Sequence, residues 1–367
     1  MKQQSMINKA KGAVKWFLPL YLFTLLPLTS VAQTTPYQPG LTTEGAIYYL
    51  PKTAFRFVIQ TEQTRYIPGE YAAYAERYLA LHDVKTEPET TYRLTHIDMV
   101  PIGVADTAKC FVVKVNPKTT AANIELAKDG VLLAVNSTVK ENELPPAFKP
   151  ARKPAEVNPR QFLNEEILSA GSTAKRAELI AQEIFNTRES KNQLIRGEAD
   201  YMPKDGEQLR IMLAQLDKQN EALSQLFVGT TVCDTTEYVL TVCPMEEIKS
   251  EVLFRLSRKL GLVDVDDLSG EPFYLTVEDL KTVPAPVEDV KKKKKVSEEG
   301  IYVNVPGRIK VSVHHGNETL YTQELPAGQF GNVELLGEDL FNKRYITHIG
   351  LNPVNGGIDK LESEQVK

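Results

Sequence analysis

The sequence predicts an α+β protein, with β-rich, sandwich-like units at both ends and a central antiparallel helical hairpin. Aromatic and β-branched runs bounded by Pro, Gly and Asn fill residues 45–135, and similar runs return after residue 229. Apolar residues at three- and four-residue spacing mark two helices between residues 172 and 228. Strands and helices that are segregated along the chain, rather than alternating, are typical of the α+β class.

Residues 1–32 have the pattern of a signal peptide. Four lysines precede the apolar run 16–28, and Ser30 and Ala32 fit a small-x-small cleavage site. Two prolines interrupt the run, which is also short for a membrane span of about 20 residues. Cleavage would remove four lysines and no acid, so the net charge would fall from −5 to −9. We therefore expect an exported protein, in the periplasm or associated with the outer membrane, with no integral span and no nucleic-acid partner.

The segment 37–144 is expected to be an N-terminal β-rich domain. Its strand-like runs are residues 46–50, 54–60, 90–100, 110–115 and 131–135. They are interrupted by a helical patch, residues 69–81, with one face formed by Tyr71, Tyr74, Ala75, Tyr78 and Leu79. This face predicts a short helix packed on a sheet. The alternative is a glycan platform formed by the three tyrosines.

A Pro-rich linker, residues 145–160, separates this domain from a helical hairpin, residues 161–228. The first helix places an apolar face on Ala177, Ile180, Ala181, Ile184 and Phe185. Asp205, followed by Gln208, has the capping-box spacing that starts the second helix. Two helices joined by about eight residues are expected to lie antiparallel.

The second helix carries a heptad-like seam, in which Asn220 takes one position. A buried Asn in such a seam fixes register and partner choice. The face of the first helix also becomes polar, at Arg188. Two interpretations are open: the hairpin docks a specific partner, within the chain or outside it, or the seam turns outward. The candidate interaction residues are Leu209, Leu213, Leu216, Asn220, Leu223 and Arg188.

The rest of the chain returns to strand character. We expect a β-rich segment at 229–283, a Lys-rich linker at 284–298 with five consecutive lysines, a C-terminal β-unit at 299–352 and a tail at 353–367. The motif "EGAIYYLP" (44–51) is echoed by "EGIYVNVP" (299–306), which predicts a duplicated β-unit. The three cysteines leave at least one thiol without an internal partner. Cys233 and Cys243 cannot bridge if a single strand separates them, because that strand would hold them too far apart.

No phosphate loop, nucleophile elbow or metal-ligand spacing appears, so no catalytic residue, cofactor or metal site is predicted. The carboxylate pairs Glu165–Glu166 and Glu246–Glu247 are sequence neighbours, which point apart on a helix or strand. This leaves three hypotheses. The first is a non-enzymatic scaffold or interaction module with an envelope protein partner. The second is the glycan-binding module of Tyr71, Tyr74 and Tyr78, and the third is a hydrolase whose carboxylates come from different domains.

Four stretches of the sequence resemble an exported family of Bacteroides-type bacteria, domain of unknown function 4831. They are "YYLPKT", the helical stretch from "FLNEEIL" to "MLAQLD", "GLVDVDDLSGEP" and "LPAGQFG". The resemblance covers most of the chain after residue 32, and the helical stretch is its most specific part. It implies an envelope protein with no assigned activity and supplies no catalytic residues.

Overall fold

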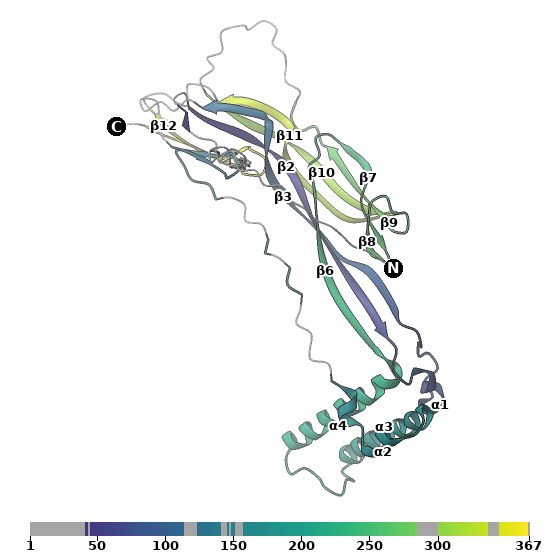
Figure 1. Ribbon diagram of the computed structural model, residues 1–367. Coiled ribbons are helices and arrows are strands. Elements are labelled where there is room, and N and C mark those ends of the chain that lie inside the picture. Colours follow the sequence, from purple (N-terminus) through teal and green to yellow (C-terminus); the bar gives the residue numbers. More distant parts are fainter. Residues whose placement is uncertain are drawn as a thin grey trace, which may run out of the picture. The chain divides into compact units, whose positions relative to one another are not determined.

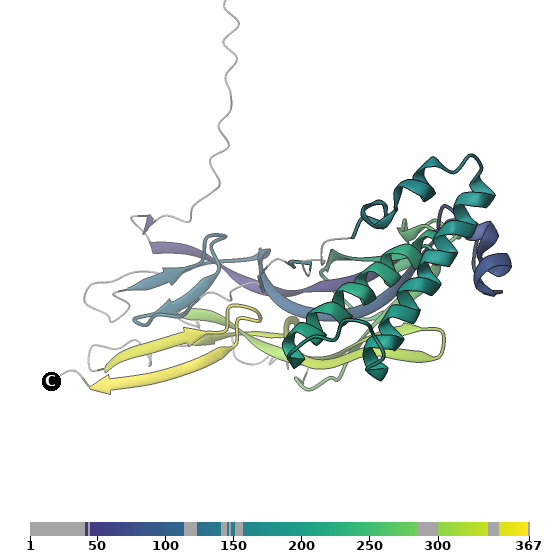
Figure 2. The ribbon, with the colours of Figure 1, turned by 90° about the horizontal axis from the view of Figure 1, so that it is seen from below.

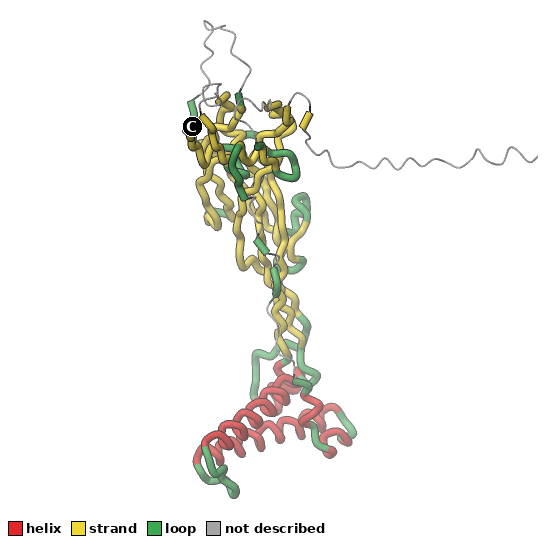
Figure 3. The backbone as a smooth tube through the Cα atoms, turned by 90° about the vertical axis from the view of Figure 1, so that its left-hand side faces the viewer, coloured by secondary structure: helices red, strands yellow, loops and turns green. Residues whose placement is uncertain are grey.

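The fold is mostly β in the computed structural model, with 50% of residues in strands and 23% in helices. The structure describes residues 41–42, 45–113, 123–140, 145–146, 148–150, 157–284, 300–336 and 345–365 (Figure 1). All of them belong to one compact unit, Pro39–Lys367. The expected signal peptide and the run of five lysines lie outside the described residues. Helices and strands occupy separate regions (Figure 3).

The first sheet is built on two long strands rather than on the short runs that the sequence predicts. Its strands are β1 (Leu41–Thr42), β2 (Gly45–Ile67), β3 (Glu89–Val113) and β6 (Thr230–Val242). β2 pairs antiparallel with β3 on one side, and with β1 and β6 on the other. Figure 1 shows β2 running between β3 and β6. The strands continue through the predicted breaks because register shifts in the ladder absorb the irregular residues.

Two further sheets combine strands from distant parts of the chain. One has the order β11-β10-β9-β7-β8 and the other the order β13-β12-β5-β4. The first consists of β7 (Ile248–Ser257), β8 (Gly261–Val263), β9 (Glu271–Asp279), β10 (Ile301–His315) and β11 (Glu318–Leu336). The second consists of β4 (Ile124–Leu126), β5 (Leu132–Val135), β12 (Tyr345–Leu351) and β13 (Ile358–Gln365). The segment 353–367, expected to be a tail, therefore contains a paired strand.

Each of these sheets crosses the segment boundaries expected from the sequence. β6, from 229–283, joins the N-terminal strands. β10, from 299–352, joins β9, and β12 joins β5. The strand pattern of a segment records which of its faces is buried, and it does not record which other strand lies beside it.

Two apolar cores hold the sheets together. In the first, Phe55 and Phe57 of β2 face Val311 of β10, and all three side chains are fully buried. Phe254 and Phe273 stack in the same core with ring centroids 4.4 Å apart. The second core gathers buried residues from the starts of β2 and β10 and from β5 and β12, namely Ala46, Tyr48, Leu50, Leu132, Val135, Ile301, Val303, Ile349 and Leu351.

The echoed motif lies at the starts of β2 and β10, and both copies share one irregularity. At this irregularity, two consecutive ladder pairs are two residues apart on the motif strand but five residues apart on its hairpin partner. The pairs that flank this skip are Tyr49–Cys110 and Pro51–Ala105 in one copy, and Val305–Asn332 and Gly307–Ala327 in the other. The skipped residue is Pro306 in the second copy and Leu50, directly before the motif proline, in the first. Proline has no N–H for the ladder, and the partner strand bulges at or next to it. The shared bulge supports a duplicated unit.

A buried polar junction ties the two copies of the motif together. Asn304 of β10 is 1% exposed, and its Nδ2 donates to the carbonyl oxygens of Pro51 and Asn355, each at 2.8 Å. Gly328 of β11 passes directly beside this amide. A Cβ at position 328 would lie 2.5 Å from Asn304 Nδ2 and 2.6 Å from the Asn355 carbonyl oxygen. The junction therefore requires glycine at this position.

Tyr48→Phe is expected to lower the free energy of unfolding by about 1–3 kcal/mol, because it leaves two buried backbone groups without a partner. The Tyr48 hydroxyl accepts from the Tyr302 N–H at 2.7 Å and donates to the Tyr302 carbonyl oxygen at 3.2 Å. Chemical denaturation at neutral pH measures the difference. A change below about 0.5 kcal/mol would contradict this role.

The same substitution is expected to change the pH dependence of stability. Burial raises the pKa of Tyr48 well above its ordinary value of 10.0. The neutral phenol therefore contributes stability that is fully present below pH 10.0 and is lost as the pH rises further. Between about pH 9 and 11 the wild-type protein should lose more stability than the Phe variant. Equal losses in the two proteins would show that the buried phenol is not responsible.

Candidate interaction surface

The helical region runs from Pro159 to Val228, so its first helix starts inside the segment expected to be a linker, residues 145–160. It consists of η2 (Pro159–Phe162), α2 (Glu165–Ser169), α3 (Thr173–Arg196) and α4 (Gly206–Val228). Ser172 caps α3 by accepting from the Lys175 N–H at 3.2 Å, and Asp205 caps α4 by accepting from the Gln208 N–H at 2.7 Å. Gly197 ends α3 in the left-handed conformation, with φ 73°. Local capping chemistry fixes these boundaries.

α3 and α4 lie side by side (Figure 2). Arg188 Nε donates to Asn220 Oδ1 at 2.9 Å, and Gln219 Nε2 donates to Glu183 Oε1 at 3.2 Å. Lys191 forms an ion pair with Asp217. Asn220 and Arg188, the polar interruptions of the two predicted faces, are therefore partners of each other.

The inner half of this helix pair is well buried. Ile180 and Ile184 of α3 pack with Leu223 and Phe227 of α4, and all four side chains are fully buried. Phe185, which the sequence placed on the same face, is instead 50% exposed. A residue adjacent to Ile184 is rotated by about 100° around an α-helix, so it lies at the margin of the buried face.

The outer half of the pair carries apolar side chains that the described part of the chain leaves exposed. We define the outer helix surface as Phe185, Ile195, Tyr201, Met202 and Ile211, which are between 39% and 66% exposed. Next to them, the seam residues Leu209, Leu213 and Leu216 are only half-buried, whereas Leu223 is fully buried. The predicted seam therefore contacts α3 fully at its inner end and incompletely at its outer end.

None of the five members of the outer helix surface was among the candidate interaction residues, and only Phe185 had been placed on a predicted apolar face. Ile211 lies two positions from both Leu209 and Leu213, which places it on the predicted polar face of the second helix. Ile195 lies seven positions after Arg188, where the predicted face of the first helix has become polar. Large aliphatic residues on a polar face were the available signal. The connection 197–205 shows no periodicity, so nothing in the local pattern predicted that Tyr201 and Met202 would be exposed.

The tyrosine face packs on the helices and not on a sheet. It is formed by two short helices, η1 (Ala72–Tyr74) and α1 (Ala75–Leu79). Tyr71 is 2% exposed, with its ring 5.9 Å from that of Phe227, so it is unavailable as part of a glycan platform. Tyr74 and Tyr78 are partly exposed and stack on each other with centroids 6.1 Å apart. The first of the three predicted platform rings is therefore a core residue.

For catalysis, the described residues matter in three respects, namely metal-ligand clusters, disulfides and cavities that hold carboxylates. No group of three or more His, Cys, Asp or Glu side chains among them could hold a metal ion. All three cysteines are unpaired, and β6 runs from Thr230 to Val242, so one strand holds Cys233 apart from Cys243. A cavity of about 960 Å³ between the ends of β2 and α4 is lined by Glu70 and Glu221, among others. Two carboxylates in one cavity are the minimum that the hydrolase hypothesis requires.

Comparison with known families places nearly the whole described fold in one group. The family profile of DUF4831, a domain of unknown function, matches residues 44–359. The chain belongs to the DUF4831 family. The match includes the helix pair and the strands of all three sheets except β1 and most of β13. No curated protein and no solved structure matches the chain.

The structure also bears on a possible membrane span. Among the described residues, no helix combines the length and the apolar character that crossing a membrane requires.

Proposed function

We propose that this DUF4831 protein is an exported, non-enzymatic interaction module of the cell envelope, and that its helix pair binds a helical segment of a protein partner. The observation that carries the proposal is the outer helix surface, with Ile195, Tyr201 and Ile211 each more than half exposed. The signal-peptide pattern of residues 1–32 supports the location.

A helical partner fits the exposed groups. Two antiparallel helices can bury the stripe between them, but each needs another element to cover the rest of its apolar surface. A third helix laid along the outer half of the pair would cover part of this exposed apolar surface. Recognition of this type uses an apolar stripe at helical spacing on the partner.

The proposal is tested with Ile195→Asp combined with Ile211→Asp. Both side chains are exposed, so we expect a melting temperature close to that of the wild type. Affinity purification from native membranes should identify a partner, and purified partner should bind wild-type protein directly. We expect the double variant to weaken that binding at least about 100-fold, because two charges would be placed against an apolar contact.

Leu168→Asp is the matched control, because Leu168 is 58% exposed on α2 and lies outside the outer helix surface. It should bind the partner as the wild type does. A partner retained at full affinity by the double variant, or lost equally by the control, would exclude the outer helix surface as the binding site. Failure to find any directly binding protein would refute the interaction role itself.

A further inference from the structure

β6 presents an unusual edge. On one side it pairs with β2 along its whole length, from Thr230 to Val242, without a register shift. On its other side no strand of the described chain pairs with it. The outward backbone N–H and C=O groups of such an edge form a template for another strand.

The other edge of the same sheet is protected. β3 contains Arg93 and Pro101, and its pairing with β2 is shifted at two places. The Tyr92 N–H donates to the carbonyl oxygen of Arg258 at 2.8 Å, which occupies this edge with a turn of the chain. Charge, proline, bulges and cover are the devices that block edge-to-edge pairing.

The remaining described edge strands, β1 of the same sheet and those of the other two sheets, carry similar devices. β4 and β8 have three residues each, and β1 has two. β11 contains Pro326 and two register shifts. β13 is exposed throughout and carries four charged side chains, Asp359, Lys360, Glu362 and Glu364, and two of them form the ion pair Lys360–Glu362. β6 thus differs from every other described edge strand.

The composition of β6 favours pairing. Its 13 residues include no proline, lysine or arginine, and eight of them are Thr or Val. Val239 is 41% exposed on the outer face of the sheet. Its two charged residues, Asp234 and Glu237, are an odd number of positions apart, so they lie on opposite faces. A long, regular, β-branched edge of this kind is a site for strand addition.

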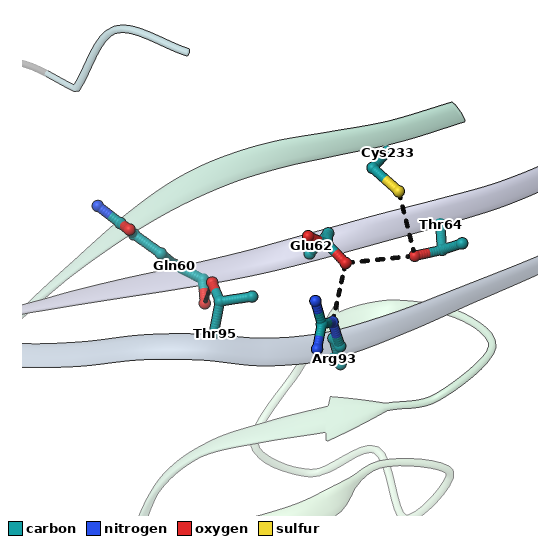
Figure 4. Close-up of polar contacts among 6 residues, drawn as sticks. All are labelled: Gln60, Glu62, Thr64, Arg93, Thr95 and Cys233. Atoms are coloured by element: carbon teal, nitrogen blue, oxygen red, sulfur yellow. Dashed lines mark hydrogen bonds and ion pairs between the residues drawn. The ribbon is translucent and has the colours of Figure 1, made fainter. Parts of the chain in front are cut away.

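Polar contacts hold the three strands β2, β3 and β6 in fixed register (Figure 4). Arg93 Nε donates to Glu62 Oε1 at 2.8 Å, and the Thr64 hydroxyl donates to the same oxygen at 3.4 Å. Thr64 also lies 3.8 Å from the Cys233 sulfur of β6. The bond from Arg93 lowers the pKa of Glu62. The edge of β6 is therefore held in a fixed position on the sheet before any partner strand binds.

We propose that β6 pairs antiparallel with β6 of a second copy of this chain, on a two-fold axis at Thr236. Most homo-oligomers are two-fold dimers, in which one surface meets itself. Thr236 is the midpoint of Thr230–Val242, so this register uses the whole strand. In an antiparallel pair, two residues that lie directly opposite each other point to the same face of the sheet. When both strands are copies of β6, this requires that the numbers of the two paired residues add up to an even number.

The same rule removes charge repulsion from the interface. Residues 234 and 237 sum to an odd number, so the two acids never face each other in any such pairing. In the register centred on Thr236, the facing pairs are Thr236–Thr236, Thr235–Glu237, Asp234–Tyr238, Cys233–Val239, Val232–Leu240, Thr231–Thr241 and Thr230–Val242. Pairs of β-branched and aromatic residues stabilise a sheet.

The first test is sedimentation of the purified protein over a range of concentrations. We expect a reversible monomer–dimer equilibrium, which Thr236→Lys combined with Val239→Lys weakens at least about tenfold, since lysine on an edge opposes pairing. Ile358→Lys combined with Leu361→Lys is the matched control, because both residues are exposed apolar positions of β13. A wild type that is monomeric at every concentration, or a dimer unaffected by the β6 lysines, would overturn the proposal.

The second test fixes the register and does not depend on the lysine variants folding. With Thr236→Cys, two thiols would face each other across the axis, at the spacing of a cross-strand pair, and mild oxidation should give a disulfide-linked dimer. The native Cys233 thiols would lie about 20 Å apart, six residues along the strands, so the wild type should not cross-link. Cross-linking through Cys233, or none with Thr236→Cys, would exclude the centred register.

Discussion

Phe227→Ala is expected to destabilise the helical region by about 3–5 kcal/mol, the usual cost of removing a buried aromatic ring. Phe227 is fully buried at the end of α4, where it contacts the Tyr71 ring and completes the core formed with Ile180 and Ile184. Truncation leaves a cavity that α3 and α4 cannot close without breaking their other contacts. Denaturation monitored by helical circular dichroism measures the loss.

Phe185→Ala is the matched control for this effect. Its ring is 50% exposed, and we expect its removal to change stability by no more than about 0.5 kcal/mol. Comparing the two variants separates residues that stabilise the helix pair from residues that are exposed on its surface. Similar losses in the two variants would mean that the outer half of the pair is part of the folding core, and would remove the basis for the outer helix surface.

Gly328→Ala is expected to cost at least about 3 kcal/mol, near the upper end for overpacking, because the neighbours that it meets are backbone and a bonded amide. The added carbon would lie within 2.9 Å of the Pro51 carbonyl oxygen as well as against Asn304 and Asn355. These groups cannot retreat without breaking the two hydrogen bonds of Asn304. Calorimetric unfolding of the purified protein measures the change.

Gly171→Ala provides the control, because an added Cβ there meets nothing within 4 Å and the residue is not in the left-handed region. It should leave stability unchanged or raise it by up to about 1 kcal/mol. If Gly328→Ala behaved in the same way, the polar junction would not be the rigid connection between the two motif copies that the geometry indicates.

These two experiments probe different levels of prediction. The helix boundaries follow from Ser172, Asp205 and Gly197, whose capping roles depend on residues three or four positions away. The buried face of α3 follows from its spacing, except at Phe185. By contrast, nothing near Gly328 in the sequence indicates that a buried amide from residue 304 will pass beside it. That contact joins residues far apart in the chain, so only the folded structure shows it.

The candidate site divides in the same way. The heptad-like spacing identified Leu209, Leu213, Leu216, Asn220 and Leu223 as a seam, and the structure places Asn220 against Arg188. The spacing could not show that the outer leucines are half-buried, because exposure depends on whether another element covers them. Likewise, the alternation in Thr230–Val242 predicts a strand but not that its outer edge lacks a described partner.

The sequence by itself determined the strand and helix character of the segments, the caps, the echoed motif and the absence of a recognisable catalytic motif. All of these features depend on residues that are close together in the sequence, through local contacts and hydrophobic periodicity. The tertiary structure alone decided which strands share a sheet and that Tyr71 is a core residue. It also decided that no described residue covers the outer helix surface or pairs with the outer edge of β6. Burial and pairing are properties of distant contacts, and a local pattern records that a face is apolar without recording what lies against it.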